Sequence, residues 1–402
     1  MSENTKVIVV GGGYAGLMAA NRLTQRDDVS VTLINPRAEF VERIRLHQLV
    51  GGSDDALVEY RDILAGPVQL LVDTVTTIDA AERHAVLAGG GTLDYDYLVY
   101  AAGSGSGTPA VPGAAEHAYP ISTLEQARKL QPVIAAAPAS APLTVVGAGP
   151  TGLETASELA ELGRRVTLVC GKVLGPYLHP KARRAVAKRL VKLGVTIIEG
   201  GDARVATMTA DAVQLADGRE LPSAVTIWTA GFSVPDLAVR SGLSTDSLGR
   251  LLTDETLTSV DDPRIIAAGD SASPSGLPVR MSCQSAMQIG PQAAETVLNR
   301  IAGKQPRHFD VGFFGECISL GRGAGVVQVA RKDDTVTKAF YEGTKSMATL
   351  KEGVCKSTIW QLKLEARRPG SINLWFKDRS RAETVRRAKT ETETETAPAV
   401  PR

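Results

Sequence analysis

The sequence predicts an α/β fold, with two parallel-sheet domains and a smaller C-terminal α+β module. Three observations lead to this prediction. A Gly-x-Gly-x-x-Gly motif follows an apolar strand in two places. Apolar strands that end in small residues and glycine follow each copy. Only 4% of the 402 residues are aromatic while 43% are hydrophobic, which suits layers rich in Ala, Val and Leu better than an all-β fold.

The first glycine motif directly follows the expected strand KVIVV (6–10). In such a motif one glycine allows a tight turn, one lets the backbone approach a pyrophosphate, and one lets helix and strand pack closely. The helix that follows, LMAANRL (17–23), would offer free N–H groups to phosphate oxygens. The candidate binding residues here are Gly11, Gly12, Gly13, Tyr14, Ala15 and Gly16.

The second motif lies in LTVVGAGPTGLE (143–154) and starts 136 residues after the first. Its candidate binding residues are Gly147, Gly149, Pro150, Thr151 and Gly152. One copy would be weak evidence, because glycine turns after strands are common. Two copies, each inside a strand–turn–helix–strand unit, predict two Rossmann-like dinucleotide-binding domains. The alternative is two ordinary βαβ turns without a ligand.

Three further strands end in small residues, in YDYLVYAAGS (95–104), VTIWTAGFS (225–233) and DDPRIIAAGDSAS (261–273). An aspartate at the mouth of a parallel sheet can accept hydrogen bonds from a flavin ribityl chain, which makes Asp270 a candidate. Each stretch alone could be a plain strand and turn. In this order they are typical of flavoproteins that bind two dinucleotides.

With these motifs the chain resembles the FAD-dependent pyridine nucleotide oxidoreductases over about residues 5–375. Within them it resembles type II NADH dehydrogenases and, more closely, the ferroptosis-suppressor-type (apoptosis-inducing-factor-like) NAD(P)H:quinone oxidoreductases. The most telling stretches are 166–198 and ISLGRGAGVVQV (318–329). The resemblance implies FAD at the first glycine motif, NAD(P)H at the second, and a quinone as electron acceptor.

The resemblance also assigns roles to single residues. FAD would be held by the first glycine motif together with Asn35, Arg43, Arg45, Ala102, Gly103 and Asp270, and NAD(P)H by the second together with Lys172 and Gly231. Asn35 stands where the family has a ribose-binding acid, and its amide oxygen can still accept a ribose hydroxyl. Arg43, Arg45 and nearby His47 could instead be solvated charges on a helix face.

Three residues are implied as catalytic by the same resemblance. Glu154 would reach the nicotinamide and the flavin N5 region, although a glutamate in the first turn of a helix is also favoured by the helix dipole. Gln284 and Gln288 match a quinone-binding pair, one helical turn apart, whose amides could donate to quinone carbonyls. The competing interpretation is two exposed helix glutamines that occur there by chance.

Two departures from the family pattern narrow the chemistry. The four cysteines, Cys170, Cys283, Cys317 and Cys355, have neither a metal-binding nor a dithiol spacing, so we expect no metal and no thiol–disulfide exchange. The strand VTLV (166–169) runs into Cys170 instead of an acid. Lys172 and Arg165 could then attract a 2′-phosphate, so we expect NADPH to be accepted at least as well as NADH. Lys172 could equally be a plain surface lysine.

The expected domains are an FAD-binding domain (1–108 and 252–303), an NAD(P)H-binding domain (109–251), a C-terminal module (304–376), and a basic segment with a disordered tail (377–402). The low-complexity end AKTETETETAPAVPR (388–402) is typical of disorder.

The charge of the chain is unevenly distributed. A net charge of +1 gives no argument for nucleic acid, but residues 355–389 carry ten Lys and Arg against three Asp and Glu. With Trp360, Trp375 and Phe376 this segment suits an anionic membrane surface. The same apolar side chains could instead be core or homodimer contacts. Residues 1–5 are polar and lead into a strand, so we expect no signal peptide and a protein of the cytoplasm, either free or peripheral to the membrane.

The leading functional hypothesis is an FAD enzyme that takes hydride from NAD(P)H and reduces a quinone. A reductase of a small ferredoxin or rubredoxin type of electron carrier would show the same two glycine motifs. A flavoprotein whose redox state gates binding to a partner is the third hypothesis.

Overall fold

Two parallel five-stranded sheets carry the two glycine motifs. The computed structural model describes residues 4–107, 109–372 and 377–396. The first sheet has the order β19-β9-β1-β2-β5 and the second β10-β17-β11-β12-β13, with every neighbouring pair parallel. Their strands are β1 Thr5–Val10, β2 Val29–Asn35, β5 Gln69–Val72, β9 Tyr97–Tyr100 and β19 Ile265–Ala267, then β10 Ala118–Pro120, β11 Pro142–Val146, β12 Arg165–Val169, β13 Thr196–Ile198 and β17 Val225–Trp228. The predicted α/β class with two Rossmann-like sheets is confirmed.

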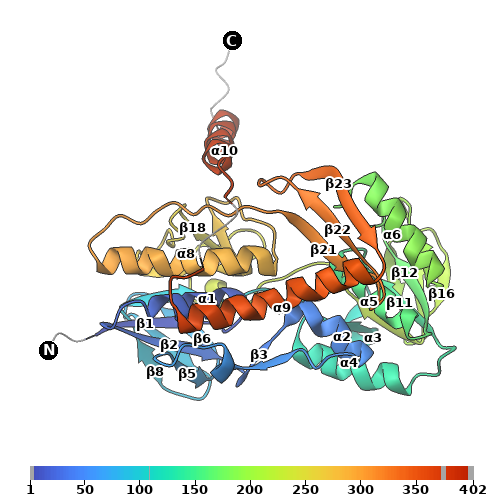
Figure 1. Cartoon of the computed structure of the whole chain (residues 1–402), viewed down its shortest axis with the longest axis horizontal. Helices are drawn as coiled ribbons and strands as arrows, with labels where there is room; N and C mark the ends of the chain where they lie inside the picture. Colours follow the sequence, from blue (N-terminus) through green and yellow to red (C-terminus); the bar gives the residue numbers. More distant parts are fainter. Residues whose placement is uncertain (1–3, 108, 373–376, 397–402) are drawn as a thin grey trace, which may run out of the picture.

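Helices cover both sheets because the central strands are apolar on both faces, as parallel sheets require. In the first half α8 (Cys283–Ile301) packs along α1 (Tyr14–Leu23) over the sheet (Figure 1). In the second half α5 (Pro150–Glu161) packs on β11 and β12, and α6 (Pro180–Lys192) packs on β13. The remaining helices are α2 Leu46–Gly51, α3 Ala114–His117, α4 Leu124–Ala136 and α7 Leu237–Arg240.

Small antiparallel sheets connect these layers. They consist of β3 Glu39–Val41 with β4 Leu57–Glu59, of β6 Val75–Asp79, β7 His84–Leu87 and β8 Thr92–Asp94, and of β14 Val205–Met208, β15 Ala212–Leu215 and β16 Glu220–Pro222. A short parallel pair joins β18 Leu251–Thr253 to β20 Ala272–Pro274. Strand β19 belongs to the first sheet, although it follows all strands of the second sheet in the sequence. This order suits a first domain made of two separate chain segments. We propose the division into 1–108 with 252–303, 109–251, 304–376 and 377–402.

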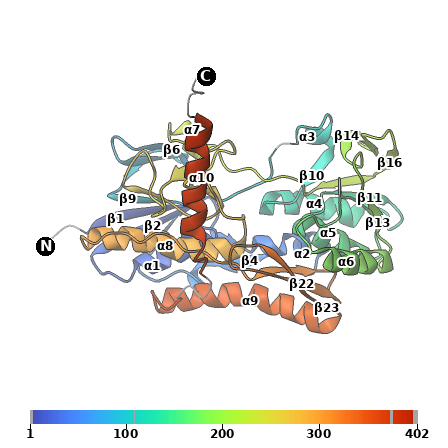
Figure 2. The same ribbon diagram turned by 90° about the horizontal axis from the view of Figure 1, so that it is seen from above.

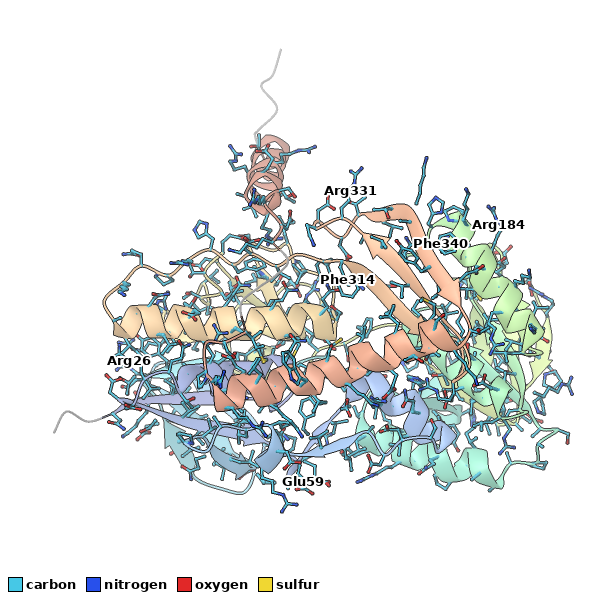
Figure 3. The ribbon with its side chains drawn as sticks, in the orientation of Figure 1. Arg26, Glu59, Arg184, Phe314, Arg331 and Phe340 are labelled. Carbon is cyan, nitrogen blue, oxygen red and sulfur yellow. The ribbon has the colours of Figure 1, made fainter. Side chains whose placement is uncertain are left out.

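The C-terminal module lies across the two halves. It contains the antiparallel strands β21 Gly315–Ser319, β22 Gly325–Ala330 and β23 Val336–Gly343, followed by the long helix α9 Lys345–Arg367. Figure 2 shows α9 running along one side of both sheets. It packs against α1 in the first half and against all three strands of its own module. Strand β23 packs on α6, where Phe340 lies beside the helix that carries Arg184 (Figure 3).

The end of the chain differs from the predicted disordered tail. Helix α10 (Arg381–Thr396) includes residues 388–396 and extends away from the body (Figure 1). The residues that begin the helix include Ala, Arg and Glu, which are good helix formers, and the helix continues from them into the repeat of Thr and Glu. Arg381 fixes its start, donating to Glu255 and to the carbonyls of Leu277 and Pro274. Residues 397–402, like Trp375 and Phe376, lie outside the described residues.

A buried ion pair joins α9 to the first half. Glu365, fully buried, accepts from Arg22 Nε and from the backbone amides of Gly370 and Ile372, at 2.7 and 2.9 Å. Arg22 also donates to Glu295 at 2.8 Å and to the Ile372 carbonyl at 2.6 Å. The carboxylate is therefore surrounded by donors, as burial of a charge requires.

We predict that Arg22→Ala lowers the free energy of unfolding by about 3–5 kcal/mol, because it leaves Glu365 charged, buried and unpaired. Urea denaturation of the full-length protein measures the change. Arg26→Ala is the matched control, since Arg26 forms an exposed pair with Asp28 and its loss should leave the free energy of unfolding nearly unchanged. Equal effects of the two substitutions would contradict the assignment.

Candidate functional site

The first glycine turn has the shape of a phosphate cradle. Gly11 has a φ of +104°, and a Cβ there would lie 2.3 Å from the Ala101 carbonyl oxygen. A Cβ on Gly16 would lie 1.8 Å from the Gly11 carbonyl, so helix and turn pack too closely for any side chain. A Cβ on Gly13 would meet no atom within 4 Å. The turn therefore leaves open space in front of the α1 N-terminus, where phosphates bind.

The second glycine turn repeats this geometry. Gly147 has a φ of +114°, and a Cβ on Gly152 would lie 1.9 Å from the Gly147 carbonyl oxygen. A Cβ on Gly149 would meet nothing within 4 Å, and Pro150 and Thr151 form the first turn of α5 behind it. Gly231, with a φ of +80°, follows the neighbouring strand β17. Both sequence motifs thus form the same open turn.

Asn35, at the end of β2, is hydrogen-bonded to the backbone on both sides of its amide. Its Oδ1 accepts from the Gly12 amide at 3.1 Å, and its Nδ2 donates to the Arg37 carbonyl at 2.9 Å. Tyr60, which the sequence motifs did not single out, donates to the Gly12 carbonyl at 2.7 Å. These bonds fix the turn from the side where a ribose would lie.

Asp270 has a free acceptor that suits a ligand hydroxyl. Its Oδ2 accepts from the Ser104 hydroxyl at 2.6 Å and lies 3.8 Å from Arg43 Nη1, while Oδ1 is buried without a partner. Burial raises the pKa of this carboxyl. Ala102 and Gly103 form the loop beside it, and the Gly103 amide donates to Ser271 Oγ at 3.2 Å. Ser104 ends the quoted stretch YDYLVYAAGS, so its position could have been found from the sequence.

Arg45 is placed differently from Arg43. Its guanidinium donates to Glu352 of α9 at 2.8 and 3.0 Å and to Glu42 at 3.2 Å. It is buried and belongs to an ion-pair cluster that ties the segment before α2 to the C-terminal module. Of the two arginines, only Arg43 is brought next to Asp270.

Glu154 lies at the centre of a buried charged cluster. Its Oε1 accepts from the Ser319 amide and from Lys351 Nζ, both at 3.0 Å. Its Oε2 lies 3.8 Å from His47 Nδ1, beyond hydrogen-bond distance. Lys351 also donates to the Cys317 carbonyl at 3.0 Å. Four segments distant in sequence therefore meet at one carboxylate.

The charge states in this cluster follow from burial and pairing. Burial disfavours the charged form of Glu154, but the charge of Lys351 and the hydrogen bond from the Ser319 amide outweigh it, and the pKa of the carboxyl is lowered. Burial lowers the pKa of His47 to about 4, so the imidazole is neutral near pH 7. Burial opposes the charge of Lys351, but Glu154 raises its pKa overall. Lys351 lies 197 residues after Glu154 in no motif, so sequence analysis missed it.

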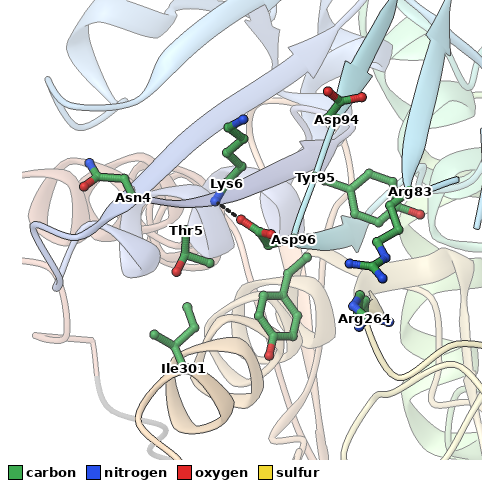
Figure 4. A pocket seen from close by; sticks show the side chains of 10 residues that line it. Asn4, Thr5, Lys6, Arg83, Asp94, Tyr95, Asp96, Arg264 and Ile301 are labelled. Carbon is green, nitrogen blue, oxygen red and sulfur yellow. Dashed lines mark hydrogen bonds between the residues drawn. The ribbon is translucent and has the colours of Figure 1, made fainter. Parts of the chain in front are cut away.

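Two surface pockets differ in their relation to these residues. One of about 310 Å³ reaches the charged cluster at Ser319 and Lys351, and is lined also by Arg322, Lys345 and Glu352. The other, of about 540 Å³, lies at the amino ends of β1, β9 and β19 (Figure 4). Ligands of parallel sheets bind at the opposite, carboxyl ends, so this second pocket is not part of the dinucleotide sites.

The predicted quinone-binding glutamines are engaged with the protein. Gln288 Nε2 donates to the carbonyls of Gln284 and Gly312, both at 3.0 Å. The Gln284 amide, oriented to satisfy both its groups, donates to the Gly315 carbonyl at 3.3 Å and accepts from the Phe314 amide at 3.1 Å. Both side chains thus join α8 to the segment before β21. The unpaired atom is Gln288 Oε1, an acceptor, whereas a quinone carbonyl needs a donor.

The remaining candidates lie after β12. Cys170 directly follows the strand, and Lys172 is exposed in the next turn. All four cysteines are free thiols. Within residues 4–107, 109–372 and 377–396, no three His, Cys, Asp or Glu side chains are grouped as metal ligands.

Comparisons with known proteins agree with this geometry. A model described as pyridine nucleotide-disulphide oxidoreductase matches residues 5–290. An NADH dehydrogenase-like protein of Mycobacterium tuberculosis is 31% identical over 354 residues, covering 80% of this chain and 87% of that protein. A type II NADH:quinone oxidoreductase of the same organism is 30% identical over 356 residues, covering 76% of each chain.

The fold is shared with solved structures. NDH2 from Plasmodium falciparum in complex with NADH aligns with a TM-score of 0.74 at 16% identity, covering 90% of this chain and 97% of that one. A sulfide:quinone oxidoreductase from Aquifex aeolicus aligns with the same TM-score at 19% identity, covering 90% and 92%. The resemblance drawn from the motifs is confirmed, and the chain belongs to the pyridine nucleotide-disulphide oxidoreductase family.

Proposed function

We propose that this chain is an FAD-dependent oxidoreductase that takes hydride from NAD(P)H and passes the electrons to a quinone. The observation that carries the proposal is the repeated open glycine turn, one copy beside the unpaired Asp270 oxygen and the other leading into Glu154. Because each turn suits one pyrophosphate, we expect the chain to bind two dinucleotides. The relatives named type II NADH:quinone oxidoreductase support the same donor and acceptor classes.

The residues of the first half fit FAD. The open space at Gly13 suits the pyrophosphate, and Asn35 Oδ1 faces the ribose side of the turn. The buried Asp270 Oδ1 needs a donor, which a ribityl hydroxyl supplies, while Ser104 and Arg43 hold the other carboxylate oxygen. When bound, FAD accepts a hydride from a nicotinamide and gives electrons to a second substrate. We assign Arg45 to the fold instead, because Glu352 and Glu42 occupy its donors.

Glu154 suits a role in orienting the nicotinamide. Its Oε1 is occupied by Ser319 and Lys351, whereas Oε2 lies beyond hydrogen-bond distance of His47. A carboxylate oxygen is the acceptor that a carboxamide NH₂ group needs. Lys351 keeps the carboxylate charged, and a charged acceptor makes the stronger bond. Glu154 is thus a fixed acceptor at the end of the second dinucleotide site.

Fewer residues of the chain support the choice of a quinone as electron acceptor. Gln284 and Gln288 can donate to quinone carbonyls only if their amides exchange their bonds to Gly315 and Gly312 for the ligand. Helix α8 begins with Ser282 as its cap, whose side chain accepts from the Ser285 amide. The quinone assignment therefore relies on the relatives more than on these two side chains.

The exposed face of α9 suits the membrane surface where a lipid quinone is found. Trp360 is 61% exposed and lies on one face of the helix with the exposed Lys356 and Arg367, and Leu350, 46% exposed, lies at the edge of this face. Leu362, on the opposite face, is fully buried against α1. The buried face therefore makes core contacts, as one alternative predicted, and the exposed face is left for the membrane contact of the other. In the described part of the chain no helix is long and apolar enough to span a bilayer. We propose attachment by this face.

We expect the purified flavoprotein to oxidise NADH or NADPH rapidly only when a soluble quinone is added. Coenzyme absorbance measures the rate, with the flavin spectrum recorded in the same samples. If the flavin is reduced but quinone adds no turnover, the acceptor is wrong, and a small iron–sulfur protein or a binding partner is the next candidate. If neither coenzyme reduces the flavin, the proposed function fails.

We predict that Glu154→Gln slows reduction of the bound flavin by the coenzyme about 10- to 100-fold, the value of a charged hydrogen bond. Stopped-flow absorbance under anaerobic conditions measures this step. Glu154→Gln alone leaves Lys351 as a buried cation without its carboxylate partner. The double variant Glu154→Gln/Lys351→Met removes this cation as well, so it separates the effect of losing the carboxylate acceptor from the effect of breaking the ion pair. Glu116→Gln, at an exposed glutamate, is the control. If both Glu154 variants reduce the flavin at the unchanged rate, Glu154 does not contact the nicotinamide.

We predict that Lys356→Gln weakens binding to vesicles rich in anionic lipid about fivefold, since one interfacial charge contributes about 1 kcal/mol. Trp360→Ala should weaken it as well, because the indole ring is lost from the apolar part of the interface. Sedimentation with the vesicles gives the partition. Val191→Ala is the matched control, because Val191 is 64% exposed on α6, away from this face. If the unmodified protein does not bind the vesicles, the exposed face of α9 is not a membrane-binding surface.

A further inference from the structure

The end of β12 is the place where the coenzyme ribose is recognised in a Rossmann fold. The Gly147 amide donates to the Val169 carbonyl at 2.9 Å, just as the Gly11 amide donates to the Ile34 carbonyl at 2.8 Å in the first unit. Cys170 is therefore the structural counterpart of Asn35. Burial, followed by the nearby charge of Glu199, raises the pKa of the Cys170 thiol to about 12. The residue at this position is neutral.

A carboxylate stands beside Cys170 on the adjacent strand. Val169 pairs with Ile198 in the parallel register, and the Cys170 amide donates to the Ile198 carbonyl at 2.8 Å. Glu199 is thus in line with Cys170, about 5 Å away across the strands, and projects from the same face. In the first unit the residue at this register is Val72, which pairs with Asn35. The acidic residue is specific to the second unit.

The Glu199 side chain is directed over the turn that follows β12. Its Oε2 accepts from the Leu174 amide at 2.8 Å, and the Gly200 amide donates to the Gly171 carbonyl at 3.0 Å. The residue is exposed, so its carboxylate is accessible to a ligand lying on the turn. One oxygen is held by the protein, and the other can accept a ribose hydroxyl.

The cations expected to attract a 2′-phosphate are less well placed. Arg165 is the first residue of β12 and lies four positions before Val169, about 13 Å along the strand. It lies at the amino end of the sheet, opposite to the coenzyme. Only Lys172 is in the turn, where its side chain is exposed. A 2′-phosphate at this turn would therefore meet a single expected cation, Lys172, and the nearby negative charge of Glu199.

We infer that Glu199 supplies the ribose-binding carboxylate that is absent at Cys170, and that the chain uses NADH in preference to NADPH. This inference rests on the proposed function and reverses the preference expected from the sequence. The carboxylate accepts from the adenosine ribose of NADH, and repels the 2′-phosphate of NADPH, which carries a charge of the same sign.

The test measures binding of NAD⁺ and NADP⁺ to the full-length flavoprotein by calorimetry, alongside flavin reduction by each reduced coenzyme. We expect the unmodified protein to favour the NAD form, and Glu199→Gln to shift the ratio about tenfold toward the NADP form. Glu199→Gln/Cys170→Asp should restore the NAD preference, because it returns a carboxylate to the usual position. Lys172→Gln, in the same turn, is the control and should move the ratio in the opposite direction from Glu199→Gln.

Two results would overturn the inference. One is tighter binding of NADP⁺ than of NAD⁺ by the unmodified protein, and the other is a ratio unchanged by Glu199→Gln with an unchanged melting temperature. Failure of the proposed function gives a different pattern, in which neither nucleotide binds and neither coenzyme reduces the flavin. In that case the role of Glu199 fails with it.

Discussion

A buried charge must have a partner, and helix α9 is the element through which this constraint joins the molecule. Glu365 near its end pairs with Arg22 of α1, Glu352 pairs with Arg45 ahead of α2, and Lys351 pairs with Glu154 of α5. Each partner belongs to a different helix or loop of the two sheet-bearing halves. The position of α9 therefore determines which groups surround Glu154, and with them the charge of the candidate coenzyme site.

The fold and the two dinucleotide turns could be predicted because their signals are local. A glycine turn, the strand before it and the helix after it occupy fewer than twenty residues, as in 143–161. The candidate Asp270 comes from a local pattern of the same kind, since it lies three residues after the buried strand β19. The backbone then forms each turn as the motif requires, with Gly11 and Gly147 at positive φ.

Other parts depend on contacts that a linear pattern does not contain. Lys351 has no motif, and only the packing of α9 brings it to Glu154. Glu199 becomes relevant only through the register of β13 against β12. The direction of the Gln288 amide is set by the Gly312 carbonyl, a contact outside the helix that carries the residue. The helix α10 shows a further limit, since low complexity and high helix propensity coincide in one segment.

The links of α9 to both sheets also restrict how the molecule can move. A hinge that opened the two halves would have to separate Lys351 from Glu154 or Arg22 from Glu365, and breaking one buried pair costs about 3–5 kcal/mol. Such an open state would be populated in fewer than one molecule in a hundred. Coenzyme exchange is therefore expected to proceed by local displacement of surface turns, with the two sheets behaving as a single rigid body.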